Sequence, residues 1–347
     1  NTGAYSVDFV DDPFIALTQY PSDQTHYLVD RRVAELYSER LTPILSNRSV
    51  LLLDASEKSK CLNRLGEYIE QLVSNEVRRD HTLVAIGGGV IQDITCFLSS
   101  TLFRGMAWEF VPTTLLAQAD SCIGSKSSIN VGEVKNLMGT FYPPRQIYIS
   151  PLFVETLSKS DFRSGVGEII KVHVIAGPQY FQELANSIEE LATSHKVLQH
   201  FVFRSLQIKQ ELVERDEFDK GPRNVMNYGH SFGHAIEAAT GFSIPHGIAV
   251  TIGMDMANRF ACSLGRIGQH DVDKMAPILQ SNAAEYLDTP IDMDKFFTAI
   301  SKDKKNVGKD LTLILLNTEL KVEKVRVKND SLFQEVCGNY LKRKNAA

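Results

Sequence analysis

Three of the nine histidines of this chain lie in one short segment, MNYGHSFGHAIEAATGFSIPHG at residues 226–247. His230 and His234 are four residues apart, so on a helix their side chains share one face. Two imidazoles on one face are a common half of a metal site. His246 follows a break at Pro245, and it could swing back as a further ligand. The spacing favours a metal site over a set of hydrogen-bonded core histidines.

Such a metal site also needs a carboxylate, and Glu168 is the best candidate. It lies in SGVGEIIKVHVI, where the surrounding residues are otherwise mostly small or apolar. Imidazole and carboxylate together suit zinc and related divalent ions.

A second candidate site is the glycine run in AIGGGVIQD, at residues 85–93. Gly87, Gly88 and Gly89 follow an expected strand and precede an expected helix. Glycines at such a junction let the backbone approach a phosphate, and the helix N-terminus offers free N–H groups to its charge. The run matches neither the G-x-G-x-x-G fingerprint nor a P-loop, so a tight strand–helix turn is the alternative.

Several cations stand in apolar or glycine-rich surroundings. Each alone is most often a solvated surface charge, but together they would suit a substrate with both phosphate and carboxylate groups. They are Arg104, Lys126, Lys135, Lys171, Lys209, Arg223, Lys304 and Lys305.

The secondary structure expected around these residues differs between the two parts of the chain. Short apolar runs in the first 150 residues, such as HYLVD, VLLLDA, TLVAIGGG, WEFVPTT and QIYIS, alternate with helical stretches. This alternation predicts a parallel sheet covered on both faces. Later, helical patterns dominate, at 160–176, 178–192, 196–216, 229–239, 248–264 and 269–284, and LTLILL with KVEKVRV suggests a hairpin.

The predicted fold is therefore α/β, with two domains. Residues 1–152 form a nucleotide-binding parallel-sheet domain, and residues 153–347 form a mainly helical metal- and substrate-binding domain. A cleft between two such domains is the default place for a site.

Composition excludes several classes of function. With 43% hydrophobic and 23% charged residues and a net charge of −5, the 347-residue chain is typical of a soluble globular protein that does not bind nucleic acid. It has no apolar run long enough for a membrane span and no secretory signal at its first residues, which lack an initiating Met. Five scattered cysteines without a C-x-x-C pair favour a reduced, cytoplasmic protein.

The order and separation of many short motifs resemble the sugar phosphate cyclases, most closely the 3-dehydroquinate synthases. The resemblance covers about residues 50–317, including GGGVIQD, FRG, VPTTLLAQADSCIGSKSSIN, KNLMGTFYPP, RSGVGEIIK, RNVMNYGHSFGHAIE, IPHG and DKK. It implies the corresponding two-domain fold, tightly bound NAD, a divalent metal ion (zinc, or cobalt in its place), an anionic sugar phosphate substrate and a homodimer.

The resemblance also implies a role for each matching residue. Glu168, His230 and His246 resemble the three metal ligands, and His234 resembles a histidine that contacts the substrate, so the i,i+4 pair does not bind the metal together. The cofactor contacts implied are Asp30, Glu57, Lys60, Gly88, Gly89, Asp93, Thr113, Thr114, Lys126, Lys135 and Thr156.

On the substrate side the implied residues are Asp120, Lys126, Asn136, Lys171, Lys209, Arg223, Asn227 and His234, with Lys304 or Lys305 as a late lysine. Arg104 resembles an arginine that reaches the phosphate in the neighbouring subunit. Arg223 and Lys209 resemble the groups that bind a substrate carboxylate, which favours 3-deoxy-D-arabino-heptulosonate 7-phosphate as the substrate.

The sequence departs from the usual synthase pattern at Gln92, Cys122, Ser125, Gly167, Tyr228 and Ser231. These differences would suit a cyclase of secondary metabolism that uses sedoheptulose 7-phosphate or makes an amino-dehydroquinate. A metal-dependent oxidoreductase of the glycerol dehydrogenase type would share the same architecture, and so would a non-catalytic binding protein built on this scaffold.

Overall fold

The structure is a computed structural model that describes residues 3–132, 134–303, 306 and 310–345. Its contacts divide the chain into two compact units, Asn1–Ser158 and Lys159–Ala347.

The first unit is built on a six-stranded parallel sheet with the strand order β1-β8-β5-β4-β2-β3. These strands are β1 (Ser6–Phe9), β2 (Thr25–Asp30), β3 (Val50–Leu53), β4 (Thr82–Gly87), β5 (Ala107–Pro112) and β8 (Gln146–Ile149). The central strands β2, β4 and β5 are buried along nearly their whole length, as expected of strands with both faces covered, whereas β8 alternates partly exposed and buried residues.

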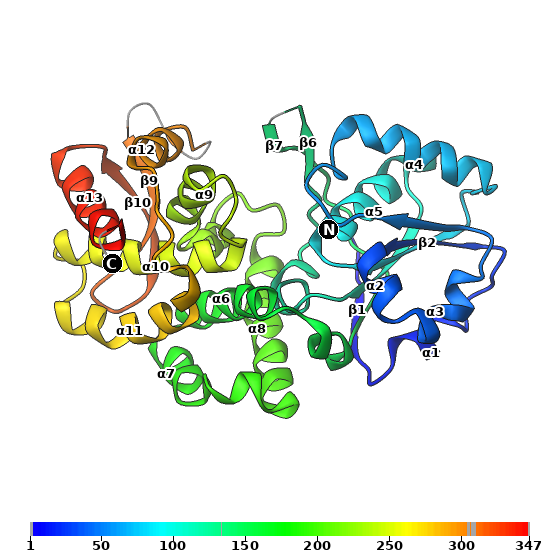
Figure 1. Cartoon of the computed structure of the whole chain (residues 1–347), viewed down its shortest axis with the longest axis horizontal. Helices are drawn as coiled ribbons and strands as arrows, with labels where there is room; N and C mark the ends of the chain where they lie inside the picture. The colour runs from blue at the N-terminus through cyan, green and yellow to red at the C-terminus, as the bar shows by residue number, and fades with distance from the viewer. Residues whose placement is uncertain (1–2, 133, 304–305, 307–309, 346–347) are drawn as a thin grey trace. The chain divides into compact units, whose positions relative to one another are not determined.

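Helices cover both faces of this sheet (Figure 1). The short helices α1 (Pro13–Leu17), α2 (Arg31–Leu36) and α3 (Ser38–Leu45) share one hydrophobic core with side chains of β2, β4 and β5. In Figure 1, α4 (Leu62–Ser74) and α5 (Gly89–Thr101) lie on the other side of β2. The predicted parallel sheet with helices on both faces is confirmed.

Two features of the first unit were not expected from the sequence. An antiparallel hairpin of β6 (Ile129–Val131) and β7 (Val134–Met138) stands apart from the main sheet. A π-helical turn, η2 (Ala117–Ser121), follows β5. Single π-turns are often found at functional sites.

The second unit is mainly helical. Its long helices are α6 (Lys159–Ala176), α7 (Pro178–Ser187), α8 (His195–Arg215), α9 (His230–Ala239), α10 (His246–Ser263), α11 (Gln269–Asn282), α12 (Met293–Ser301) and α13 (Ser331–Asn345). Most residues of α10 are buried, because α6, α9, α11, α13 and β9 (Asp310–Leu316) pack around it. The predicted hairpin is present as β9 and β10 (Val322–Lys328).

Glycines allow α6 and α10 to pack with their backbones in close contact. A Cβ atom at Gly167 would lie 2.2 Å from the carbonyl oxygen of Gly247, and one at Gly247 would lie 1.9 Å from that of Ser164. Real Cβ atoms do not approach an oxygen so closely, so larger side chains at either position would separate the two helices. Glu168 and His246 are the immediate neighbours of these glycines, and the close packing therefore sets the distance between them.

No helix in the described part of the chain is both long and apolar enough to span a membrane.

Candidate active site

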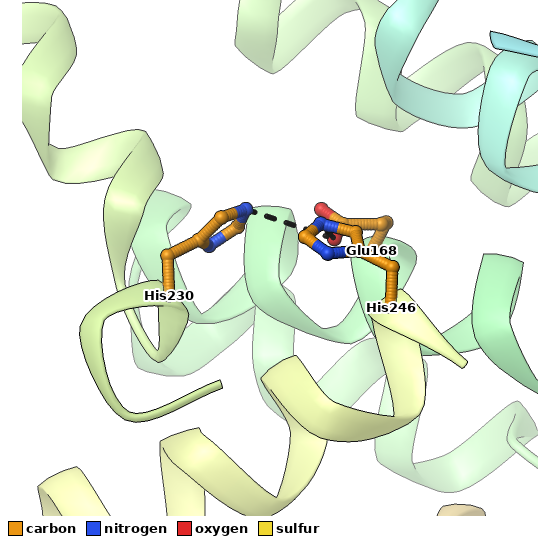
Figure 2. A group of neighbouring side chains, drawn as sticks. All are labelled: Glu168, His230 and His246. Carbon is orange, nitrogen blue, oxygen red and sulfur yellow. Dashed lines mark ion pairs between the residues drawn. The ribbon is translucent and has the colours of Figure 1, made fainter. Parts of the chain in front are cut away.

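The Glu168 carboxylate and the imidazoles of His230 and His246 meet in the second unit (Figure 2). Glu168 projects from the middle of α6, whereas His230 and His246 are the first residues of α9 and α10. Glu168 Oε1 lies 3.5 Å from His246 Nε2 and 3.9 Å from His230 Nε2. Ligand atoms of a tetrahedral zinc ion lie about 3.3 Å apart when each bond is about 2.0 Å. One oxygen and two nitrogens at these separations therefore fit a divalent metal ion.

The Glu168 carboxylate is almost completely buried, with 1% of its side chain exposed. Its Oε2 lies 2.5 Å from Nζ of Lys171, which is one helical turn later in α6 and equally buried. A buried carboxylate requires opposite charge or hydrogen-bond donors close by. Lys171 supplies one positive charge, and the two imidazoles face the other oxygen.

Each of the two histidines makes a second contact through its other ring nitrogen. His230 Nδ1 lies 3.2 Å from the carbonyl oxygen of Tyr228, and His246 Nδ1 lies 3.3 Å from Oε1 of Glu237. Burial lowers the pKa of His246, but the hydrogen bond and charge of Glu237 and the charge of Glu168 outweigh it, so the net shift is upward.

His234 lies on the same face of α9 as His230 but is exposed. Its ring centroid is 5.5 Å from that of His230 and 5.8 Å from that of His246. The imidazoles of His230, His234 and His246 thus lie close together, and His234 lies on the outside of the group. A second combination, His234, Glu237 and His246, also has its potential ligand atoms within 4.8 Å of one another.

Three cations expected in the site are buried in the same unit. Lys171 belongs to α6, Lys209 to α8 and Arg223 to the 3-10 helix η5 (Pro222–Asn227), and these three elements pack against one another. Arg223 donates from Nη1 to the carbonyl oxygen of Glu217 at 2.8 Å. Asn227 also lies in η5, which leads directly to His230.

The glycine run joins β4 to α5 in the first unit. Gly88 is the N-cap of α5, and Gly89 is its first residue. A Cβ atom at Gly88 would lie 2.9 Å from the methyl carbon of Thr114, so a larger residue would crowd this turn. Backbone N–H groups at the start of a 13-residue helix offer a site for an anion.

A hydrogen-bonded network lies beside this helix and includes four of the predicted residues. Lys60 Nζ lies 2.9 Å from Oδ2 of Asp93 and 3.0 Å from Oδ1 of Asn136. Glu57 Oε2 accepts a hydrogen bond of 2.8 Å from Nδ2 of Asn130. Burial raises the pKa of Asp93 to about 6, although the charge of Lys60 acts in the opposite direction. The network connects the β6–β7 hairpin to α5 and to the loop after β3.

The remaining residues predicted in the first unit occupy varied environments. Asp30 ends β2 and caps α2, and burial raises the pKa of its carboxyl group. Thr113 is buried, and its N–H donates to the carbonyl oxygen of Gly87 at 2.9 Å. Asp120 lies in η2, and the exposed Thr156 hydroxyl is 2.9 Å from that of Tyr37.

Arg104 and Lys126 are exposed, and Lys135 is partly exposed on β7. Arg104 has a positive φ of 65°, as does Ser125, which immediately precedes Lys126. Non-glycine residues in this region of backbone space are uncommon and cluster at functional sites. Lys304 and Lys305 lie outside the described residues.

Glu237 and Asn130 were not predicted as site residues. Glu237 is two helical turns after His230 and shares its helix face, so spacing alone could have drawn attention to it. Asn130 carries no comparable signal, because its importance depends on contacts with Glu57 and with Asn136, whose backbone N–H donates to its Oδ1 at 2.9 Å.

Comparisons with known proteins agree with one another. The sequence models of the 3-dehydroquinate synthase N-terminal and C-terminal parts match residues 50–164 and 165–306. A 3-dehydroquinate synthase of Thermoanaerobacter sp. (strain X514) is 32% identical over 342 residues, which cover 95% of this chain and 96% of the relative.

Two solved structures share the fold. A 2-epi-5-epi-valiolone synthase from Streptomyces hygroscopicus, with NAD+ and Zn2+ bound, has a TM-score of 0.86 at 23% identity and covers 98% of both chains. A 2-deoxy-scyllo-inosose synthase complexed with carbaglucose-6-phosphate, NAD+ and Co2+ has a TM-score of 0.83 at 25% identity, with 96% of both chains covered.

Proposed function

The chain belongs to the 3-dehydroquinate synthase family, and we propose that it converts 3-deoxy-D-arabino-heptulosonate 7-phosphate into 3-dehydroquinate and phosphate. The enzyme is a lyase that eliminates phosphate and closes a carbocycle. The observation that carries the proposal is the group of Glu168, His230 and His246, which lies in a unit that also buries Lys171, Lys209 and Arg223.

The cofactors are NAD and a divalent metal ion, which is zinc or cobalt. When bound, they supply hydride transfer to and from one substrate carbon and polarisation of the oxygen on that carbon. Oxidation and re-reduction at the same carbon cancel, so the enzyme releases no net NADH.

Glu168, His230 and His246 would hold the metal. Their donor set of one carboxylate and two neutral imidazoles is one that divalent zinc and cobalt accept. Lys171 stays paired with Glu168 Oε2 and compensates the charge of this buried carboxylate. His234 lies at the exposed side of the group, where it can contact a substrate hydroxyl.

Lys209 and Arg223 would bind the substrate carboxylate. Both are buried in elements that pack against α6, the helix that carries Glu168, and ammonium and guanidinium groups pair well with a carboxylate. Further polar contacts to the sugar phosphate would come from Asp120, Lys126, Asn136, Asn227 and either Lys304 or Lys305. The elimination and the final aldol step both occur within one substrate molecule, so holding it in one orientation reduces the conformational freedom that must be lost in each step.

NAD would bind to the first unit. The backbone N–H groups of Gly88 and Gly89 at the start of α5 suit its pyrophosphate. Glu57, Lys60 and Asp93 lie beside this helix start, in one network, and would contact the ribose and nearby groups. Asp30, Thr113, Thr114, Lys135 and Thr156 complete the proposed cofactor contacts.

We also propose that the enzyme is a homodimer in which Arg104 reaches the substrate phosphate in the partner subunit. The exposed position and positive φ of Arg104 suit a side chain that acts outside its own subunit. The five free cysteines suit a reducing compartment such as the cytoplasm.

The first experiment measures phosphate release by purified protein with NAD and zinc. It offers heptulosonate 7-phosphate and sedoheptulose 7-phosphate in parallel, identifies the product by mass and follows NADH by absorbance. We expect dehydroquinate from the first substrate only and no net NADH. A carbocycle from the second substrate only would instead indicate a cyclase of secondary metabolism, and stoichiometric NADH would indicate an oxidoreductase.

A further inference from the structure

We infer that Glu237 is a positioning residue for the metal site, because its carboxylate fixes the His246 imidazole in the tautomer that presents Nε2 to the metal. The inference rests on the proposed metal site, and it concerns a residue that need not touch the metal. Glu237 lies on α9, whereas His246 begins α10, so the contact also ties these two helices together.

The two nitrogens of His246 face different carboxylates. Nε2 lies 3.5 Å from Glu168 Oε1, and Nδ1 lies 3.3 Å from Glu237 Oε1. A neutral imidazole carries one proton, and the nitrogen that binds a metal must be the one without it. An ionised carboxylate only accepts hydrogen bonds. Glu237 therefore holds the proton on Nδ1 and leaves the lone pair of Nε2 directed at Glu168.

His230 follows the same rule with a different acceptor. Its Nδ1 lies 3.2 Å from the carbonyl oxygen of Tyr228, which can only accept, and its Nε2 is the nitrogen that faces Glu168. Both proposed ligand histidines thus have their outer nitrogen directed at an acceptor. Acceptors of this kind orient metal-binding histidines and increase their basicity.

His246 depends on this contact more than His230 does. The exposed fraction of the His246 side chain is 35%, compared with 14% for His230. Packing alone therefore restricts the His246 ring less, and a hydrogen bond to Nδ1 contributes more to its orientation. The acceptor for His246 is also a side chain, so it can be changed without altering the backbone.

The alternative is that Glu237 binds a second metal ion together with His234 and His246, whose potential ligand atoms also lie close together. That site would need the lone pair of His246 Nδ1 while Nε2 binds at Glu168. One neutral imidazole has a single lone pair in the ring plane, so it cannot serve both sites. The geometry therefore favours one metal ion per chain.

The test measures the Zn2+ dissociation constant of metal-free protein by competition with a chromophoric chelator. We expect Glu237→Ala to bind zinc ~10–100-fold more weakly at an unchanged stoichiometry of one. Glu237→Gln should lose less, because its amide oxygen still accepts from Nδ1. Glu183→Ala is the matched control, because it also removes a carboxylate that contacts a histidine in the same unit. Oε1 of Glu183 lies 3.2 Å from Nε2 of His200, and both side chains are about half exposed.

An unchanged zinc affinity in Glu237→Ala would overturn the inference. So would a stoichiometry that falls from two to one, since this would make Glu237 a ligand. If a variant fails to fold, the nitrogen-15 spectrum of the histidines in zinc-loaded wild-type protein decides, and a His246 Nδ1 without a proton would contradict the inference. Because no sugar phosphate or NAD is present, failure of the proposed reaction would leave these results unaffected.

Discussion

The imidazole of His246 lies between two carboxylates of the second unit. Its Nε2 faces Glu168, and its Nδ1 faces Glu237. We expect His246→Ala to lose bound metal and turnover together, because one of three proposed ligands is removed. Elemental analysis measures the metal content of the variant, and phosphate release measures its turnover. A variant that keeps full metal content and turnover would remove His246 from the ligand set.

The positive charge of Arg223 leads to a prediction about the affinity for a carboxylated substrate. If its guanidinium binds the substrate carboxylate, Arg223→Ala should weaken binding of heptulosonate 7-phosphate by about 2–5 kcal/mol, as for a lost buried charge pair. Steady-state kinetics measure this, and the zinc affinity of the variant shows whether the nearby site is intact. Unchanged KM and kcat would rule Arg223 out as the carboxylate-binding residue.

A substitution at Asn130 tests the direction of its hydrogen bond with Glu57, in which Asn130 Nδ2 is the donor. Asn130→Asp keeps the acceptor for the Asn136 N–H but sets a carboxylate against Glu57, where Nδ2 now donates at 2.8 Å. We expect weaker NAD binding and a loss of about 1–3 kcal/mol of stability. Adding Glu57→Gln restores a donor and should recover part of the stability. Thermal unfolding and calorimetric titration with NAD measure both effects, and no recovery would contradict the assigned contact.

The contact between α6 and α10 sets the distance between Glu168 and His246. Gly247→Ala would place a Cβ atom 1.9 Å from the Ser164 carbonyl oxygen. The helices must then separate, which should cost about 1–3 kcal/mol or more and weaken zinc binding. Gly66→Ala is the control, because nothing lies within 4 Å of a Cβ atom there, in the middle of α4.

Gly66→Ala should stabilise the protein by about 0.5–1 kcal/mol, since alanine favours a helix over glycine. Denaturant unfolding of both variants gives the comparison. Equal changes in the free energy of unfolding for Gly247→Ala and Gly66→Ala would show that α6 and α10 leave room for a Cβ atom at Gly247.

Elements with a strong apolar pattern were predictable from the sequence, and elements without one were not. The buried strands β2, β4 and β5 and the helix α6 follow from continuous or periodic apolar residues. The edge strand β1 and the hairpin strand β7 were missed, because most of their residues are exposed and give no such pattern.

The site was predictable in part for a related reason. Spacing brought the three histidines together, and Glu168 stood out as a charge among small and apolar residues. Spacing could not rank the histidines as ligands, because that depends on where α10 begins. The sequence suggested a helix at 248–264, but α10 begins at His246 directly after Pro245, which turns this imidazole toward Glu168. Long-range contacts such as Asn130 with Glu57 leave no local signal at all.

The stability of the whole fold should decrease on mild acidification because of a buried histidine pair, His26 and His81, in the first unit. His26 Nδ1 lies 2.6 Å from the Ser49 hydroxyl, and His26 Nε2 lies 2.8 Å from His81 Nδ1. Burial, together with the charges of His81 and Arg48, lowers the pKa of His26 to about 4. The unfolded chain accepts this proton near pH 6.5, whereas the folded chain resists it until about pH 4.

The stabilisation from neutral His26 is therefore complete above pH 6.5 and is lost as the pH falls toward 4, by up to about 3 kcal/mol. His26→Gln cannot take up the proton, so its free energy of unfolding should fall less than that of the wild type over this range. Asp93 and His173, whose pKa values are also shifted, are present in both proteins and cancel in the difference. Urea unfolding from pH 7.5 to pH 4.5 measures the two curves. Parallel curves would show that His26 is protonated equally in the folded and unfolded chains.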